Sequence, residues 1–144
     1  MATRDGSAEW RGDLRDGSGT VSVASGLFSD GNYSFTSRFE EGTGTNPEEL
    51  IAAAHAGCFS MALSNILSGE GHTPDSVRTT AKVHLRMVEG NPTIARIDLI
   101  TEGRVPGIDQ GQFSEYAEQA KAGCPVSRAL AGVGEITLDA QLAS

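Results

Sequence analysis

The chain has 144 residues, a length that fits one domain, and we expect a single domain over residues 1–144. Hydrophobic residues make up 38% and charged residues 21%, an ordinary globular balance that argues against intrinsic disorder. The formal net charge of −8 makes the chain a poor candidate for binding nucleic acid or an anionic membrane surface.

The sequence contains no uninterrupted apolar run of about 18 residues, so it predicts no transmembrane helix. The N-terminal segment is rich in charge and lacks the apolar stretch of a signal peptide, so we expect no secretory signal and a cytoplasmic location. In that reducing compartment, two cysteines do not form a disulfide framework. They are either packed core residues or reactive groups.

The N-terminal third of the chain predicts three strands. Residues 8–14 and 21–23 alternate between the two faces of a hairpin, with a turn at residues 15–19. After another turn, residues 33–40 alternate so that the aromatic side chains share one face of a third strand. Arg38 falls on the opposite face of that strand.

A long helix is predicted next. Asn46 suits the N-cap, Pro47 suits the first helical position, and Glu49 completes a pattern like a capping box. We expect this helix to extend to about Leu67. Because its interior is apolar on nearly all sides, we expect it to be central and buried.

The rest of the chain predicts strands and shorter helices. Two long strands follow, joined by a turn at residues 89–92, then a helix that ends at Ala122–Gly123, a short helix from Cys124 to Leu130 and a last strand over residues 136–142. Short turns between consecutive strands favour antiparallel sheets. The fold class is therefore predicted to be α+β with antiparallel sheets.

The two cysteines lie in different settings. Cys58 lies within the long apolar helix, where burial makes a thiol inert, and a plain core role remains open for it. Cys124 lies at the N-cap of a helix with Pro125 after it, where backbone N–H groups favour a thiolate. By local chemistry alone, Cys124 is the more reactive of the two.

Other polar residues near the long helix have ordinary alternatives. Arg38 is either a solvated strand residue or a cation that stabilises a thiolate, and Glu48 and Glu49 are either partners of the helix dipole or site residues. His55 and Cys58 are spaced so that both could face one metal ion, but no paired motif supplies further ligands. We find no phosphate-binding glycine loop and no nucleophile-elbow serine, and we predict neither a metal nor a cofactor.

Several segments, taken together, resemble the OsmC family (osmotically inducible protein C), and the OsmC branch more than the organic hydroperoxide resistance (Ohr) branch. The matching segments follow one another in family order and cover almost the whole chain. They are residues 10–13, 19–21, 33–40, 44–51, 53–63 and 121–127.

The resemblance implies an OsmC-like fold, with antiparallel β-sheets wrapped around a long buried helix, in an intertwined homodimer with active sites at the subunit interface. It implies a thiol-dependent peroxidase that reduces organic hydroperoxides, and hydrogen peroxide more slowly, in stress defence. Cys58 matches the peroxidatic cysteine, Cys124 the resolving cysteine, Arg38 the activating arginine and Glu48 the glutamate that holds it. A dithiol reductant, such as a lipoylated protein, is implied as the partner.

Helix geometry adds a question about Glu48 and Cys58. Ten helical residues rise by about 15 Å and leave Glu48 on a different face from Cys58. Either the helix bends at Gly57, or Arg38 and Glu48 serve the Cys58 of the partner chain, and we favour the partner chain. The sequence leaves two roles open for Phe39, Phe59 and Met61, which either line an apolar substrate pocket near Cys58 or are plain core residues.

Two other functions remain open from the sequence. One is a general thiol–disulfide redox protein without specialisation for peroxides. The other is a non-enzymatic stress protein in which Cys58 and Cys124 are structural, so that replacing either costs only packing energy, about 1 kcal/mol or somewhat more.

Overall fold

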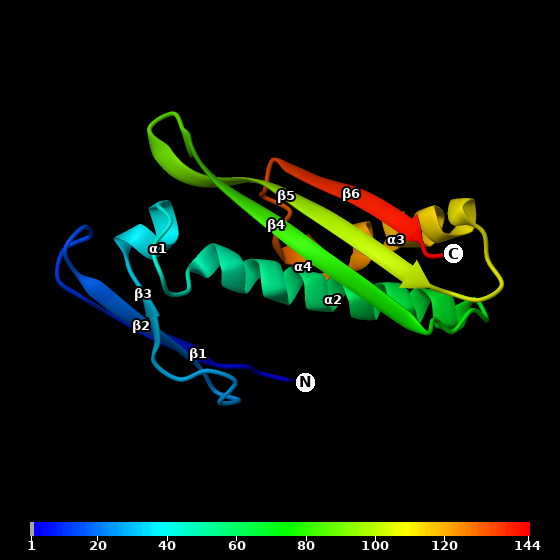
Figure 1. The fold of residues 1–144 in the computed structure, drawn as a ribbon, viewed down its shortest axis with the longest axis horizontal. Helices are drawn as coiled ribbons and strands as arrows, with labels where there is room; N and C mark the ends of the chain where they lie inside the picture. The colour runs from blue at the N-terminus through cyan, green and yellow to red at the C-terminus, as the bar shows by residue number, and fades with distance from the viewer. Residues whose placement is uncertain (1) are drawn as a thin grey trace. The chain divides into compact units, whose positions relative to one another are not determined.

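A computed structural model describes residues 2–144 of the chain (Figure 1). The chain divides into two compact units, Met1–Leu50 and Ile51–Ser144. Among the described residues, each unit contains one three-stranded sheet. Helix α2 (Pro47–Gly69) begins in the first unit and continues in the second.

The sheet of the first unit contains β1 (Gly6–Arg11), β2 (Ser18–Val23) and β3 (Gly31–Tyr33) in that order. Both pairs are antiparallel, as the sequence predicts. The Trp10 ring packs on the Tyr33 ring with centroids 5.3 Å apart, which joins the two outer strands over β2. The first strand ends earlier than expected, at Arg11.

The predicted strand over residues 33–40 is wrong beyond Tyr33, because Phe35–Phe39 forms helix α1. Ser34 caps this helix: its hydroxyl accepts from the Ser37 backbone N–H, and the Ser37 hydroxyl in turn accepts from the Ser34 backbone N–H. The rings of Phe35 and Phe39, four residues apart, lie 5.0 Å apart on one face of the turn. Arg38 therefore lies in the last turn of a short helix.

The N-terminus of α2 is capped as predicted by Asn46, whose Oδ1 accepts from the Glu49 backbone N–H at 2.8 Å. The Glu49 carboxylate does not complete a capping box, because it accepts from the Thr45 hydroxyl at 2.6 Å. Asn46 also donates to the Ser37 carbonyl at 2.9 Å, and this bond joins the start of α2 to α1.

Helix α2 is buried along one stripe only, so the expectation of a helix buried on nearly all sides is wrong for the single chain. Phe59, Leu63 and Leu67 are fully buried, whereas Met61 on the opposite face is 77% exposed. The sheet of the second unit, α3 (Gln110–Gly123) and residues next to them in the chain supply the core that covers the buried stripe. The apolar residues of the opposite face remain uncovered.

By length and composition alone, α2 could also cross a membrane, and no other helix of residues 2–144 passes that test. The central helix of a water-soluble protein passes it equally, so the test carries little weight. The fully buried stripe of α2 places one side of it in a protein core.

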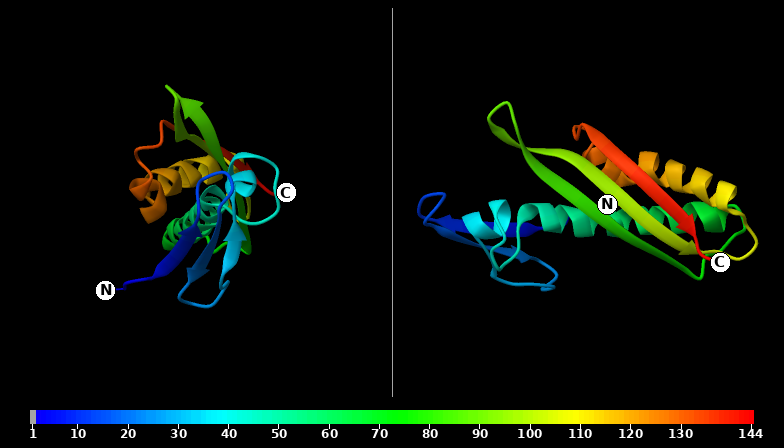
Figure 2. Two further views of the ribbon diagram at one scale, coloured as in Figure 1. Left: turned by 90° about the vertical axis from the view of Figure 1, so that its left-hand side faces the viewer. Right: turned by 45° about the horizontal axis from the view of Figure 1, so that its top comes forward.

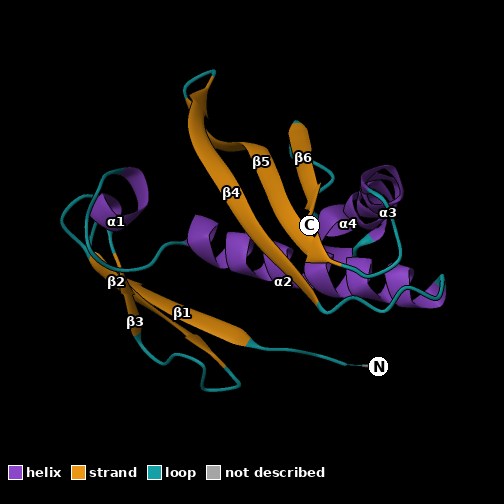
Figure 3. Cartoon of the chain, turned by 45° about the vertical axis from the view of Figure 1, so that its right-hand side comes forward, coloured by secondary structure: helices purple, strands orange, loops and turns teal. Residues whose placement is uncertain are grey.

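The sheet of the second unit contains β4 (Ser76–Val88), β5 (Asn91–Arg104) and β6 (Glu135–Leu142), with β5 in the centre. Strands β4 and β5 are antiparallel and joined by Glu89–Gly90, as predicted. Strands β5 and β6 are parallel, so the prediction of purely antiparallel sheets is wrong. Helices α3 and α4 (Pro125–Ala129) lie between them in sequence and form the long crossover that parallel strands need (Figure 3).

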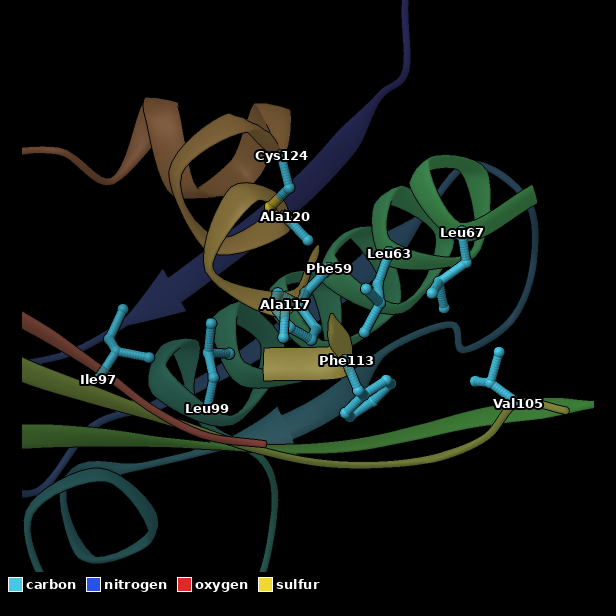
Figure 4. Packing of buried hydrophobic residues seen from close by; sticks show 10 residues of the cluster. All are labelled: Phe59, Leu63, Leu67, Ile97, Leu99, Val105, Phe113, Ala117, Ala120 and Cys124. Atoms are coloured by element: carbon cyan, nitrogen blue, oxygen red, sulfur yellow. The ribbon is translucent and has the colours of Figure 1, made fainter. Parts of the chain in front are cut away.

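Helices α2 and α3 lie on one face of this sheet (Figure 2). The core between them contains ten residues from α2, from β5 and the residue just after it, and from α3 and the residue that follows it (Figure 4). Cys124 belongs to this core, beside Ala120 at the end of α3. The face of the sheet that carries Ile97 and Leu99 is therefore covered.

Candidate active site

The Arg38 side chain pairs with Glu48 inside the first unit. Its Nε and Nη2 atoms donate to the same carboxylate oxygen, Glu48 Oε1, at 3.1 and 2.9 Å. The Glu48 side chain is 8% exposed and that of Arg38 is 35% exposed, so the pair is only partly hydrated. The structure thus brings together two of the four residues that the sequence singles out.

Arg38 also lines a cavity of about 390 Å³ in the first unit. The guanidinium carbon lies 5.2 Å from the centre of the Phe39 ring, within the range of a cation–π contact. The other large apolar side chains of the lining are those of Trp10, Leu14 and Phe35. A group bound here would meet both aromatic surface and the Arg38 cation.

Cys58 is a half-buried free thiol on α2. Burial raises the pKa of the Cys58 thiol, the Val126 backbone N–H opposes this rise, and neighbouring Cys124 adds to it. Cys124 is therefore close enough to Cys58 to affect its ionisation. The raised pKa means that Cys58 needs a cation close to its sulfur to react as a thiolate at neutral pH.

Cys124 is a free thiol and only 1% exposed. It caps α4 as predicted, because its Sγ accepts from the Ser127 backbone N–H at 3.3 Å. Its S–H donates to Ser127 Oγ at 3.2 Å. Since Cys124 is buried and Cys58 is partly open, solvent reaches Cys58 more easily.

Sequence reasoning missed a residue that the structure joins to this pair. Ser127 Oγ lies 2.7 Å from Nε2 of His55, and His55 is completely buried. Burial lowers the pKa of His55 below its ordinary value of 6.5. The sequence drew attention to His55 only through its spacing from Cys58, which suggested a metal site. It gave no sign of the contact with Ser127, which lies 72 positions after His55.

No group of three or more His, Cys, Asp or Glu side chains gathers into a possible metal site within residues 2–144. Phe59 is fully buried in the core, as expected of a plain core residue, whereas Met61 is 77% exposed. Phe39 does line a cavity, but the one beside Arg38. The predicted site residues thus form two pairs, Arg38–Glu48 and Cys58–Cys124.

Comparison with known sequences identifies the family. Residues 40–139 match the family model described as OsmC-like protein. The chain belongs to the OsmC-like protein family. It is 52% identical to "Peroxiredoxin OsmC" of Escherichia coli (strain K12) over 141 residues, which cover 98% of this chain and 97% of the relative.

More distant OsmC-like relatives include an "Organic hydroperoxide resistance protein" of Xanthomonas axonopodis pv. citri. It is 31% identical over 100 residues, which cover 67% of each chain. Among solved structures, that of the organic hydroperoxide resistance protein OhrB of Bacillus subtilis is similar, with a TM-score of 0.71 and 24% identity. The alignment covers 96% of this chain and 98% of that one, and it confirms the predicted fold family.

Proposed function

We propose that this OsmC-like protein is a thiol-dependent peroxidase that reduces organic hydroperoxides to alcohols. The observation that carries the proposal is the placement of its two cysteines, a half-buried Cys58 and a buried Cys124 that perturbs its pKa. Membership of a family with relatives named as a peroxiredoxin and as organic hydroperoxide resistance proteins supports the same activity.

In the first step, the Cys58 thiolate attacks one peroxide oxygen and the O–O bond breaks. The alkoxide leaves and takes up a proton to become the alcohol, and Cys58 becomes a sulfenic acid. Arg38 stabilises the thiolate and the developing charge on the leaving oxygen, since a guanidinium stays charged and offers several donors. Glu48 orients this guanidinium through Oε1.

In the second step, the Cys124 thiol condenses with the Cys58 sulfenic acid, which releases water and leaves a Cys58–Cys124 disulfide. A dithiol reductant, such as a lipoyl group on another protein, restores both thiols by thiol–disulfide exchange. The cavity beside Arg38 binds the organic part of the peroxide, which explains a preference for organic hydroperoxides over hydrogen peroxide.

The proposed enzyme is a cytoplasmic homodimer whose subunits each form one domain. The uncovered apolar face of α2, including Met61, supports a partner subunit, because exposed apolar surface of this kind is usually covered in a stable assembly. In the dimer, the Arg38–Glu48 pair of one subunit serves the Cys58 of the other. The rise of about 15 Å over ten helical residues supports this arrangement.

The test is a thiol count after fully reduced protein receives one equivalent of cumene hydroperoxide, with hydrogen peroxide in parallel. The proposal predicts rapid loss of both thiols with the organic peroxide and slower loss with hydrogen peroxide. Cys58→Ser should lose the reaction, whereas Cys124→Ser should accumulate a sulfenic acid that a dimedone-type reagent traps.

Two other outcomes would replace the proposal. Survival of both thiols in the wild type would leave the cysteines as structural residues of a non-enzymatic stress protein. Disulfide formation at similar rates with every oxidant would identify a general thiol–disulfide redox protein.

A further inference from the structure

His55 is a completely buried histidine that the proposed mechanism leaves without a role. Its Nε2 lies 2.7 Å from Ser127 Oγ, and Ser127 Oγ lies 3.2 Å from Cys124 Sγ. The three side chains form one hydrogen-bonded row from the thiol to the imidazole. The row connects α2 with the residues around the start of α4.

The donors and acceptors give this row a direction. The Cys124 S–H donates to Ser127 Oγ, so the Ser127 hydroxyl hydrogen is available for His55 Nε2. Burial favours the uncharged imidazole, in which Nε2 can accept that hydrogen when Nδ1 carries the ring proton. Each group of the row can then pass a proton on toward His55.

The other ring nitrogen argues against a purely structural role. Nδ1 of His55 is buried and has no hydrogen-bond partner among residues 2–144. An unsatisfied buried polar group costs about 1–3 kcal/mol of folding free energy. If His55 served only to link the helices through Ser127, a side chain with a hydroxyl group could do so without leaving a ring nitrogen buried and unpaired. Unlike a hydroxyl group, an imidazole in this position can act as a base that takes up and releases a proton.

Cys124 needs a route by which its thiol can lose a proton. It is 1% exposed, so solvent has little access to its thiol. Only a few per cent of an ordinary thiol is ionised at neutral pH, and the thiolate is the nucleophile. The reaction with a sulfenic acid therefore requires that the thiol lose its proton inside the protein.

We propose that His55, acting through the Ser127 hydroxyl, takes the proton of the Cys124 thiol while Cys124 attacks the Cys58 sulfenic acid. This inference rests on the proposed peroxidase function. The Cys124–Cys58 S–S bond forms as the S–O bond of Cys58 breaks. The hydroxide leaves as water with a proton from solvent, and His55 then releases the proton that it received. His55 is thus a positioning residue of the disulfide-forming step, because it acts through Ser127.

The titratable groups along this route are few. Burial is the cause that lowers the pKa of His55, and the only ionisable side chain on the row besides His55 is the Cys124 thiol. Cys58 follows one turn later on α2. If replacing His55 changes the pH profile of disulfide formation, the change therefore reflects the loss of proton transfer along this row.

The experiment separates the two chemical steps. Fully reduced protein is mixed with one equivalent of cumene hydroperoxide, and acid-quenched samples are measured by intact mass for sulfenic acid and for disulfide. The variants are His55→Gln and Ser127→Ala, and Ser127→Thr keeps the hydroxyl. Thr101→Val is the matched control, because it removes a buried hydroxyl from the same unit without touching the row.

In His55→Gln and Ser127→Ala, we expect an unchanged rate of sulfenic acid formation and a disulfide step slowed by about 100-fold, the usual effect of losing a general base. Ser127→Thr and Thr101→Val should stay within a few-fold of the wild type. In His55→Gln, the logarithm of the disulfide rate should rise with pH with a slope near one, whereas the wild-type rate should already be level at neutral pH because the pKa of His55 is lowered.

An unchanged disulfide step with an unchanged pH profile in both variants would overturn the relay while leaving the peroxidase intact. If the wild type forms no sulfenic acid at all, the proposed function itself is wrong. If His55→Gln folds poorly, Ser127→Ala against Ser127→Thr decides the question, since these two differ in the hydroxyl and in size only.

Discussion

Arg38 holds Glu48 through a single carboxylate oxygen: Nε and Nη2 both donate to Oε1, at 3.1 and 2.9 Å. The second oxygen, Oε2, is buried and has no hydrogen-bond partner within residues 2–144. A buried carboxylate oxygen without a donor is costly, so it marks a place where another group is expected to bind. In the proposed dimer, that group comes from the peroxide or from the partner subunit.

Arg38→Lys should slow the oxidation of Cys58 by cumene hydroperoxide by about 100-fold or more, the usual loss when a donor to a developing oxyanion is removed. Lysine keeps the charge but cannot offer a planar pair of donors to Glu48 Oε1. The measurement is a stopped-flow rate for thiol loss. Arg15→Lys is the control, since Arg15 contacts the Phe35 ring and should react like the wild type. Equal rates in both variants would contradict a specific role for the Arg38 guanidinium.

Arg38→Met should move the midpoint of the pH–rate profile to higher pH. Burial raises the pKa of Cys58, and in the proposed dimer the Arg38 cation opposes that rise, so its removal leaves the pKa higher. The thiolate is then scarce at pH 7 and becomes abundant only in alkaline solution. The variant should therefore be slow at neutral pH and recover much of the lost rate above pH 9. The same deficit at every pH would show that Arg38 binds the substrate without tuning the thiol.

Mixed dimers test whether the site is shared between subunits. In a dimer of one Cys58→Ser subunit and one Glu48→Ala subunit, a shared site leaves one intact Cys58 opposite one intact Glu48. If each site is formed within one chain, no intact site remains, because each chain carries one of the two substitutions. Subunits with two different tags can be purified as the mixed species, and peroxide turnover should then be about half that of the wild type. Turnover as low as in the two parent homodimers would show that Glu48 serves its own chain.

Local patterns predicted most of the secondary structure because each of these elements carries its own signal. Asn46–Pro47 starts α2, Cys124–Pro125 starts α4, and period-two alternation marks β4 and β5. The segment after Tyr33 misled because Phe35 and Phe39 are four residues apart, a spacing that puts both side chains on one face of a strand and also on one face of a helix. Ser34 and Ser37 decide for the helix through reciprocal capping bonds.

What the sequence could not give depends on contacts between distant residues. The parallel pairing of β6 with β5 follows from a crossover through two helices, which no local pattern specifies. Ser127 and His55 meet although 72 positions separate them, and only the packing of α4 near α2 joins them. The roles proposed for Cys58 and Cys124 come from the family resemblance, whereas local chemistry alone ranks Cys124 as the more reactive thiol.

Gly103→Ala should destabilise the second unit by about 1–3 kcal/mol, the usual cost of overpacking a core. A Cβ atom at position 103 would collide with the Phe113 ring of α3, which lies directly on the strand. The measurement is urea unfolding followed by circular dichroism. Gly123→Ala is the control, because an added Cβ there meets nothing within 4 Å. The double variant Gly103→Ala/Phe113→Leu should recover part of the loss, and no recovery would place the strain elsewhere.

Asp98→Asn should weaken the sheet of the second unit at neutral pH but much less in acid. The Asp98 carboxylate accepts from the Thr137 hydroxyl at 2.6 Å, from Arg96 Nε at 2.7 Å and from His84 Nε2 at 2.7 Å, so it connects all three strands. These donors hold the pKa of Asp98 well below its ordinary value of 3.8.

Because the folded state lowers this pKa, the unfolded chain binds the proton more readily, and the contribution of Asp98 is present above about pH 4 and lost as the pH falls. Hydrogen bonds to a charged group contribute about 1.5–3 kcal/mol, so Asp98→Asn should lose stability of that order at pH 7. The difference in the free energy of unfolding between variant and wild type, measured by urea unfolding, should decrease steadily from pH 4 to pH 2. Asp139→Asn, at an exposed position of β6, should change little at any pH. A stability difference that stays constant down to pH 2 would mean that Asp98 acts through shape and packing rather than through its charge.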